Sequence, residues 1–299
     1  MTRRNANILL LLAGAVWGMG FIAQTTAMED IGPHTFVGAR FIIATLVLIP
    51  FAMWETKRST KPLPKIAYLQ FIFIGFLLFV SMALQQVGLL TTTVTNSGVL
   101  TGLYVIFVPI LALGLFRQWP HFIVWPSVLL TFAGIYLLSG GSISDLTYGD
   151  VLTILCAVAT AFQVIFITRY AIQYSRPMTF SFIQFASIAI FGTLVAVTTE
   201  QISVASLIGA LPEILYAGIF SSALAFTIQA VAQQYTTAPQ AAIFMSTEVL
   251  FAALFGAVLL GERIAYIGYL GGLLIFIAMV LTETVPYMKF KKPKKMIRS

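Results

Sequence analysis

Residues 33–41 read PHTFVGARF, and residues 177–185, 144 positions further along the chain, read PMTFSFIQF. The two segments share the proline, the threonine and both phenylalanines at matching positions. The same offset, without a gap, relates four further matches: Gln85 with Gln229, Thr92 with Thr236, Thr93 with Thr237, and LLTF (129–132) with LLIF (273–276). A constant offset through polar and proline positions indicates that the chain consists of two repeated halves.

The composition indicates that both halves lie in lipid. Hydrophobic residues make up 59% of the 299 residues and charged residues only 9%, and the mean hydropathy is +0.96. A water-soluble domain carries about 25% charged residues. The long, continuous apolar runs predict an all-α polytopic membrane protein.

Ten apolar runs are long enough to be transmembrane helices. They cover Ile8–Ala27, Pro33–Trp54, Ile66–Gly88, Thr95–Phe116, Phe122–Ser139, Gly149–Tyr170, Pro177–Thr198, Leu211–Gln233, Pro239–Leu260 and Ile264–Thr282. Each half contains five spans, an odd number, so the second half enters the membrane from the opposite face. We therefore expect two inverted five-helix repeats, residues 1–144 and 145–299, the second with a basic cytoplasmic tail.

The distribution of charge predicts the orientation. Fifteen of the 17 Lys and Arg residues fall at the face that bears both termini, while Arg263 falls at the opposite face and Arg40 within a span. By the positive-inside rule both termini are cytoplasmic, and we expect a multi-pass protein of the plasma membrane, the inner membrane of a bacterium. The net charge of +7 thus reflects topology and not nucleic-acid binding. The first span is expected to be a retained helix and not a cleaved signal peptide.

Several classes of protein lack support in the sequence. The connections between spans are too short for a soluble catalytic or output domain, and there is no P-loop or HExxH motif. The single cysteine, Cys156, cannot form an internal disulfide. We therefore expect no enzyme activity and neither cofactor nor metal, and favour a transporter over a membrane-embedded enzyme, a sensor or a channel.

Three segments carry a family resemblance. AGAVWGMGFIAQ (13–24), GPHTFVGARF (32–41) and TTAPQAAIFMSTEVLFAALFGAVLLGERI (236–264) resemble the EamA type of the drug/metabolite transporter superfamily, over nearly the whole chain. The resemblance implies export, or less often import, of small metabolites such as amino acids, driven by the substrate gradient or a proton gradient. It also implies a central cavity lined mainly by spans 1, 3, 4, 6, 8 and 9. The chain departs from the family pattern at Val249, where proline often follows the glutamate, and in LFRQWP (115–120), where a Gly-Glu-Arg-like turn is common.

Glu248 is the one carboxylate in the apolar segment FMSTEVLFAALF (244–255). A charged side chain costs about 2.5 to 3.5 kcal/mol at the centre of a membrane helix. Its repeat mate is Tyr104, so the two side chains should lie at about the same depth. Glu248 either holds a substrate amine or a coupling proton, or is a neutral, hydrogen-bonded residue that ties span 9 to a neighbour. We expect it to be mostly neutral while the cavity is closed to water.

Arg40, about two turns into span 2, is the other charge expected to be buried, and it needs a partner or water because it stays charged. It either anchors span 2 to neighbouring helices or captures a substrate carboxylate. Buried amides are expected to hydrogen-bond across helices or to line the cavity. With Arg40 set apart for that structural or carboxylate-binding role, the candidate cavity residues are Trp17, Gln85, Thr101, Tyr104, Gln163, Gln229, Phe244 and Glu248.

Aromatic cavity faces with one acid suit amino acids or amine-bearing metabolites, and also hydrophobic drug cations. A sugar-phosphate carrier would need several basic residues in the cavity, and only Arg40 is available. The expected partners are therefore a small-molecule substrate, the lipid bilayer and a coupling proton, with no nucleic acid. The expected assembly is a monomer or a homodimer.

Overall fold

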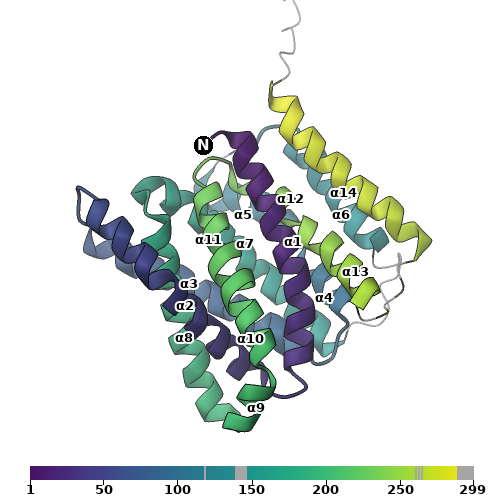
Figure 1. The fold of residues 1–299 in the computed structure, drawn as a ribbon. Helices are drawn as coiled ribbons and strands as arrows, with labels where there is room; N and C mark the ends of the chain where they lie inside the picture. Colours follow the sequence, from purple (N-terminus) through teal and green to yellow (C-terminus); the bar gives the residue numbers. More distant parts are fainter. Residues whose placement is uncertain (118, 139–146, 260, 262, 264, 288–299) are drawn as a thin grey trace, which may run out of the picture.

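The computed structural model describes residues 1–117, 119–138, 147–259, 261, 263 and 265–287. Its regular elements are all helices, and no strand occurs among the described residues. The helices stand side by side in a bundle, and the amino terminus and the last turn of α14 lie at the same end (top of Figure 1). The basic tail after Tyr287 lies outside the described residues.

The first half contains α1 (Arg3–Ala27), α2 (Pro33–Arg58), α3 (Lys65–Gly88), α4 (Val94–Thr101), α5 (Tyr104–Phe116) and α6 (Val124–Leu138). The second half contains α7 (Tyr148–Tyr174), α8 (Pro177–Thr199), α9 (Val204–Gly209), α10 (Leu211–Tyr216), the π-helix η1 (Ala217–Leu224), α11 (Ala225–Ala232), α12 (Ala238–Met245), α13 (Thr247–Leu259), α14 (Tyr266–Thr284) and the short 3₁₀-helix η2 (Val285–Tyr287).

Nine of the ten predicted spans are, within the described residues, helical segments long and apolar enough to cross a membrane. The fifth, predicted over Phe122–Ser139, is the shorter apolar helix α6 of 15 residues. Three predicted ends, Ser139, Leu260 and Ile264, lie outside the described residues. The short helix α9, in the connection before the eighth span, was not predicted.

The repeated Pro-x-Thr motif begins a helix in each half. Pro33 is the first residue of α2, where its missing N–H costs nothing. Glu200, just after α8, accepts hydrogen bonds from the backbone N–H groups of His34 and Thr35, each at 2.8 Å, and from the Thr35 hydroxyl at 2.6 Å. A carboxylate is favourable at a helix N-terminus because it faces the positive end of the helix dipole.

The second half has the equivalent carboxylate cap at the start of α8, whose first residue is Pro177. Glu55, near the end of α2, accepts hydrogen bonds from the N–H groups of Met178 and Thr179 at 3.1 and 2.8 Å and from the Thr179 hydroxyl at 2.7 Å. Each of these two long helices thus caps the start of the other. The shared Pro and Thr of the motif are explained by this exchange.

The packing of the remaining helices follows the repeat. The second spans of the two halves, α2 and α8, pack together, as do the fifth spans, α6 and α14. The third span of each half packs on the first span of the other, in the pairs α3–α7 and α11–α1. This is the pairing that two inverted repeats produce.

The fourth and ninth spans, predicted as continuous helices, are both broken. α4 gives way to α5 at Gly102 and Leu103, and α12 gives way to α13 at Ser246. Tight i to i+3 hydrogen bonds mark both breaks, from Val105 N–H to Gly102 O and from Val249 N–H to Ser246 O, each at 3.1 Å. Gly102 and Ser246 are separated by the repeat offset. Each half therefore presents the start of a half-helix in mid-span.

Candidate functional site

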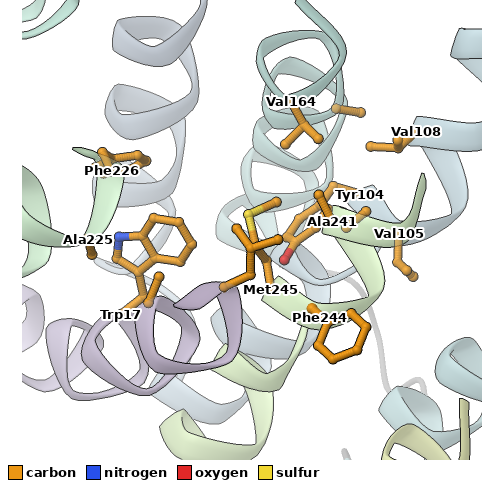
Figure 2. Packing of buried hydrophobic residues seen from close by; sticks show 14 of the residues in the cluster. Trp17, Tyr104, Val105, Val108, Val164, Ala225, Phe226, Ala241, Phe244 and Met245 are labelled. Carbon is orange, nitrogen blue, oxygen red and sulfur yellow. The ribbon is translucent and has the colours of Figure 1, made fainter. Parts of the chain in front are cut away.

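A small central cavity, with a volume of about 50 Å³, lies between the two halves. Spans 1, 3, 4, 6, 8 and 9 all contribute to its wall, and Arg40 adds a contribution from span 2. Its lining is Trp17, Phe21, Gln24, Arg40, Leu78, Met82, Gln85, Thr101, Tyr104, Thr160, Gln163, Val164, Ser221, Phe226, Gln229, Met245 and Glu248. Figure 2 shows Trp17, Tyr104, Val164, Phe226 and Met245 around this region.

Eight of the nine residues singled out from the sequence line this one cavity: Trp17, Arg40, Gln85, Thr101, Tyr104, Gln163, Gln229 and Glu248. Phe244 does not, and the expectation that it does is corrected. Its ring lies among the buried apolar side chains, apart from the Trp17 and Phe226 rings in Figure 2. A continuous helix would place Phe244 one turn below Glu248 on the same face, but the break at Ser246 lies between them. Met245 lines the cavity in its place.

Arg40 is only 1% exposed and is held by neutral groups. Its Nε donates to the Ser222 hydroxyl at 2.9 Å, Nη2 to the Ser221 hydroxyl at 3.1 Å, and Nη1 to Gln24 Oε1 at 3.2 Å. The guanidinium also lies over the Phe36 and Phe41 rings, 5.6 and 5.3 Å from their centroids. Within the described part of the chain, no carboxylate bonds to it. The positive charge of this buried guanidinium is therefore not neutralised by a carboxylate among the described residues.

The π-helix η1 in span 8 creates this arrangement. A π-turn inserts an extra residue into the helix, and such turns are frequent at functional sites. Here it carries Ser221 and Ser222, whose hydroxyls bind Arg40. The Ser221 carbonyl also accepts a hydrogen bond from Trp17 Nε1 at 2.9 Å, and the Trp17 ring packs on Phe226 with centroids 4.8 Å apart. The serine pair was missed in the sequence, where its one signal was two adjacent polar residues inside an apolar span.

Glu248 and Tyr104, the repeat mates, face each other across the cavity wall closely enough to interact electrostatically. Tyr104 is the first residue of α5, and Glu248 lies in the first turn of α13, so both sit at the half-helix starts. They are 2% and 7% exposed. The Tyr104 hydroxyl is the nearest polar group to the Glu248 carboxyl, but neither that hydroxyl nor Glu248 Oε1 makes a hydrogen bond of normal geometry among the described residues.

The cavity amides are only partly satisfied. Gln85 Nε2 donates to the Thr101 hydroxyl at 3.0 Å, and Gln229 Nε2 donates to Gln163 Oε1 at 3.3 Å. Gln163 Nε2 and Gln229 Oε1 are left without a partner in the described chain. Rotating both amides by 180° would exchange the roles but would again leave one donor and one acceptor. The wall thus offers a donor, an acceptor, a cation and an acid.

The other lining residues are mostly apolar, and their position could not be read from the sequence. Phe21, Leu78, Met82, Val164, Phe226 and Met245 have the same residue types as the lipid-facing side chains of the same spans. In a soluble protein, apolar residues mark the buried face of a helix, whereas a membrane helix is apolar all round. Only polar residues distinguish the cavity face in such a sequence.

A helical bundle of two inverted repeats, with broken spans around a polar cavity near the middle, is the architecture of secondary transporters. The EamA-like transporter family matches the chain twice, over residues 4–140 and 147–284. The chain belongs to this family, which confirms the resemblance.

Two curated relatives come from Archaeoglobus fulgidus, and each is described as an uncharacterized transporter. One is 31% identical over 94% of this chain and 86% of its own length. The other is 23% identical over 92% of this chain and 96% of its own length. A solved crystal structure of another protein superposes with a TM-score of 0.77 over 97% of this chain and 100% of that one. Its 16% identity shows the fold alone.

Proposed function

We propose that this transporter carries a small metabolite with both an amino group and a carboxylate, most simply an amino acid, out of the cell by alternating access. The observation that carries the proposal is that a guanidinium and a carboxyl group line the same cavity. Arg40 is bound only by neutral groups, and Glu248 has an oxygen without a partner among the described residues. A zwitterion supplies the missing partner of each.

The chemistry of the two groups favours this class of substrate. A guanidinium binds a carboxylate through paired, charge-assisted hydrogen bonds, and it is costly to bury without a countercharge. A carboxylate binds an ammonium in the same way, and the Trp17 and Phe226 faces add cation–π attraction. The unpaired atoms of Gln163 and Gln229 can bind a neutral polar group of the same molecule.

Glu248 is also the candidate site for a coupling proton. A carboxylate in a cavity that opens alternately to two solutions can take up a proton on one side and release it on the other. The proposed setting is the plasma membrane of a bacterial-type cell, with both termini cytoplasmic. The distribution of Lys and Arg supports this orientation.

A second candidate substrate class is the hydrophobic organic cation. Four aromatic rings, those of Trp17, Phe21, Tyr104 and Phe226, line the cavity together with one acid, and this combination binds cationic dyes and drugs as well. Such a substrate leaves Arg40 without a role and repels it. The two classes therefore differ in their dependence on Arg40.

Transport by purified protein in liposomes tests the proposal. Amino acids, the corresponding decarboxylated amines, nucleosides and cationic dyes are offered to the native protein and to the variants Arg40→Gln and Arg40→Lys. We expect amino acids to be transported, and Arg40→Gln to reduce their transport roughly tenfold or more. Arg40→Lys should rescue only in part, because an ammonium lacks the forked geometry. Equal transport of amino acids by the native protein and Arg40→Gln would refute the carboxylate role, and transport of dyes alone would favour the second candidate.

A further inference from the structure

Thr92 and Thr236, which the repeat relates, lie in equivalent turns. Thr92 lies in the turn between α3 and α4, and Thr236 lies in the turn between α11 and α12. Each turn leads into one of the broken spans. Because the repeat is inverted, the two turns lie at opposite ends of the bundle.

Thr92 joins the two halves at one end. Its hydroxyl donates to Asp150 Oδ1 at 2.7 Å, and Asp150 lies in the first turn of α7 with 6% of its surface exposed. The other oxygen, Asp150 Oδ2, accepts a hydrogen bond from the Thr147 N–H at 2.9 Å as part of a capping box. We call Thr92 and Asp150 the Asp150 clamp.

A longer chain of hydrogen bonds joins the halves at the end that bears the amino terminus. The Thr236 hydroxyl donates to Gln240 Oε1 at 3.1 Å, and Gln240 Nε2 donates to Glu283 Oε2 at 3.1 Å. Asn7 Nδ2, in α1, donates to the same Glu283 oxygen. Asn7 and Gln240 are each 1% exposed. We call these four residues the Glu283 clamp.

The two clamps hold equivalent elements. The Asp150 clamp joins the first span of the second half, α7, to the turn before the broken fourth span of the first half. The Glu283 clamp joins the first span of the first half, α1, to the broken fourth span of the second half, through Glu283 of α14. The helices that each clamp joins also line the central cavity. For the Asp150 clamp, α7 contributes Gln163 and α4 contributes Thr101. For the Glu283 clamp, α1 contributes Trp17 and α12 contributes Met245.

A second cavity lies against the Glu283 clamp. Thr236 and Gln240 of the clamp line it together with Ala112 of α5 and Ile165 of α7. The central cavity begins one residue away on α7, at Val164. Val108 on α5 and Ala241 on α12 are fully buried, and Figure 2 shows both in the same region as Val164. Neighbouring residues of α7, Val164 and Ile165, therefore line the central cavity and the second cavity respectively.

We propose that the Asp150 clamp and the Glu283 clamp are the two gates of the transport cycle, which open alternately. The proposal rests on the alternating access proposed above but not on the identity of the substrate. Charge-assisted hydrogen bonds to a carboxylate stabilise the closed arrangement of each end. Loss of one clamp shifts the equilibrium toward the state in which that end is open. The opposite end then closes, because one half rocks as a rigid body against the other around the central site.

The test measures access to the central cavity without any substrate. Thr160→Cys, on the cavity wall, serves as reporter in a Cys156→Ala background, and a membrane-impermeant cationic thiol reagent is applied to one side of the membrane at a time. Thr92→Val removes the cross-half bond while the Asp150–Thr147 capping box remains. Asn7→Leu removes the bond from α1 to Glu283. Thr284→Val is the matched control, because this exposed hydroxyl bonds only to Val280 O in its own helix, at 2.7 Å.

We expect Thr92→Val to raise the labelling rate from the Asp150 end roughly three- to tenfold, and to lower it from the other end. Asn7→Leu should do the reverse, while Thr284→Val and the conservative change Thr92→Ser should leave both rates unchanged. If the Asn7→Leu variant does not insert into the membrane, Gln240→Met serves instead, because it removes the hydrogen bonds of Gln240 to Thr236 and Glu283 in the same clamp. Equal changes from both sides, or no change in either rate, overturn the proposal. Neither result bears on amino-acid recognition, which is measured separately through Arg40.

Discussion

Two ionisable side chains in the spans, Arg40 and Glu248, line the central cavity. Their contribution could be predicted from the sequence because a charge inside an apolar run has few acceptable surroundings. What could not be predicted is which neighbouring groups bind each of the two side chains. The Ser221–Ser222 pair that binds Arg40 depends on the π-turn in span 8, and the hydroxyl of a serine inside an apolar span often bonds to its own helix instead.

Glu248→Gln tests whether the acid takes part in transport. The change keeps the shape and the hydrogen-bonding capacity of the side chain but removes its negative charge and its ability to carry a proton. We expect transport to fall at least tenfold and its dependence on pH, between about pH 5 and about pH 8, to disappear. Initial rates in liposomes at each pH are the measurement.

The matched variant for this experiment is Glu248→Leu. If Glu248 only tied span 9 to a neighbour, the Gln variant would transport normally with an unchanged pH profile, and the Leu variant would lower thermal stability instead. Normal transport by Glu248→Gln would therefore contradict the proposed role of the acid.

Gln85 and Gln229, which the repeat relates, both line the cavity, although they bond to different partners. We expect Gln85→Ala and Gln229→Ala each to reduce transport several-fold, because each removes an amide that a polar substrate can use. Both variants should still insert into the membrane, and their free energies of unfolding should stay within about 1 kcal/mol of the native value. Transport assays and thermal unfolding in detergent measure the two effects. Normal transport by both variants would assign these amides to helix contacts alone.

At the scale of helices, the existence of the spans was predictable and their irregularities were not. Ten apolar runs follow from length and hydropathy. The breaks at Gly102 and Ser246 were hidden, because neither residue interrupts hydropathy and both can occur in a continuous membrane helix. Only the repeat offset, which relates the two positions, carries a signal. Phe244 was misplaced for the same reason, since its expected face assumed one unbroken helix.

Close contact between the two fifth spans gives a stability prediction. A Cβ atom added to Gly271 would lie 2.4 Å from the Gly134 carbonyl oxygen and 2.9 Å from Leu138 N, which are backbone atoms that cannot move aside cheaply. We expect Gly271→Ala to lower the free energy of unfolding by about 1 to 3 kcal/mol. Thermal unfolding in detergent is the measurement. The neighbouring change Gly272→Ala is the control, because its nearest contact is the flexible end of Leu250 at 3.4 Å. Equal stability of the two variants would show that α6 and α14 can separate freely.

At the scale of the whole molecule, the inverted repeat explains why features far apart in the sequence recur in pairs. The two carboxylate caps, Glu55 on α8 and Glu200 on α2, are one example. The two broken spans are another. The repeat was predictable because it left the same polar and proline residues at one offset. The two halves differ at the central cavity. Arg40 lies in the first half, and its repeat mate is the neutral Gln184. Among the described residues, the π-helix η1 occurs in the second half alone.

The last prediction concerns how the molecule is oriented in the membrane. Arg3, Arg58 and Arg169 belong to the end that bears the amino terminus and the last turn of α14, and we expect this end to face the cytoplasm because Lys and Arg are retained there. Lys61→Cys, in the loop after α2, and Ile202→Cys, between α8 and α9, report on opposite ends; both sites are exposed. The native Cys156 is buried and should label slowly. In intact cells an impermeant thiol reagent should label position 202 and spare position 61 until the membrane is permeabilised. The reverse pattern would place both ends on the opposite sides of the membrane and contradict the predicted orientation. Labelling of both positions from outside would contradict the odd number of spans in each half, on which the inverted repeat depends.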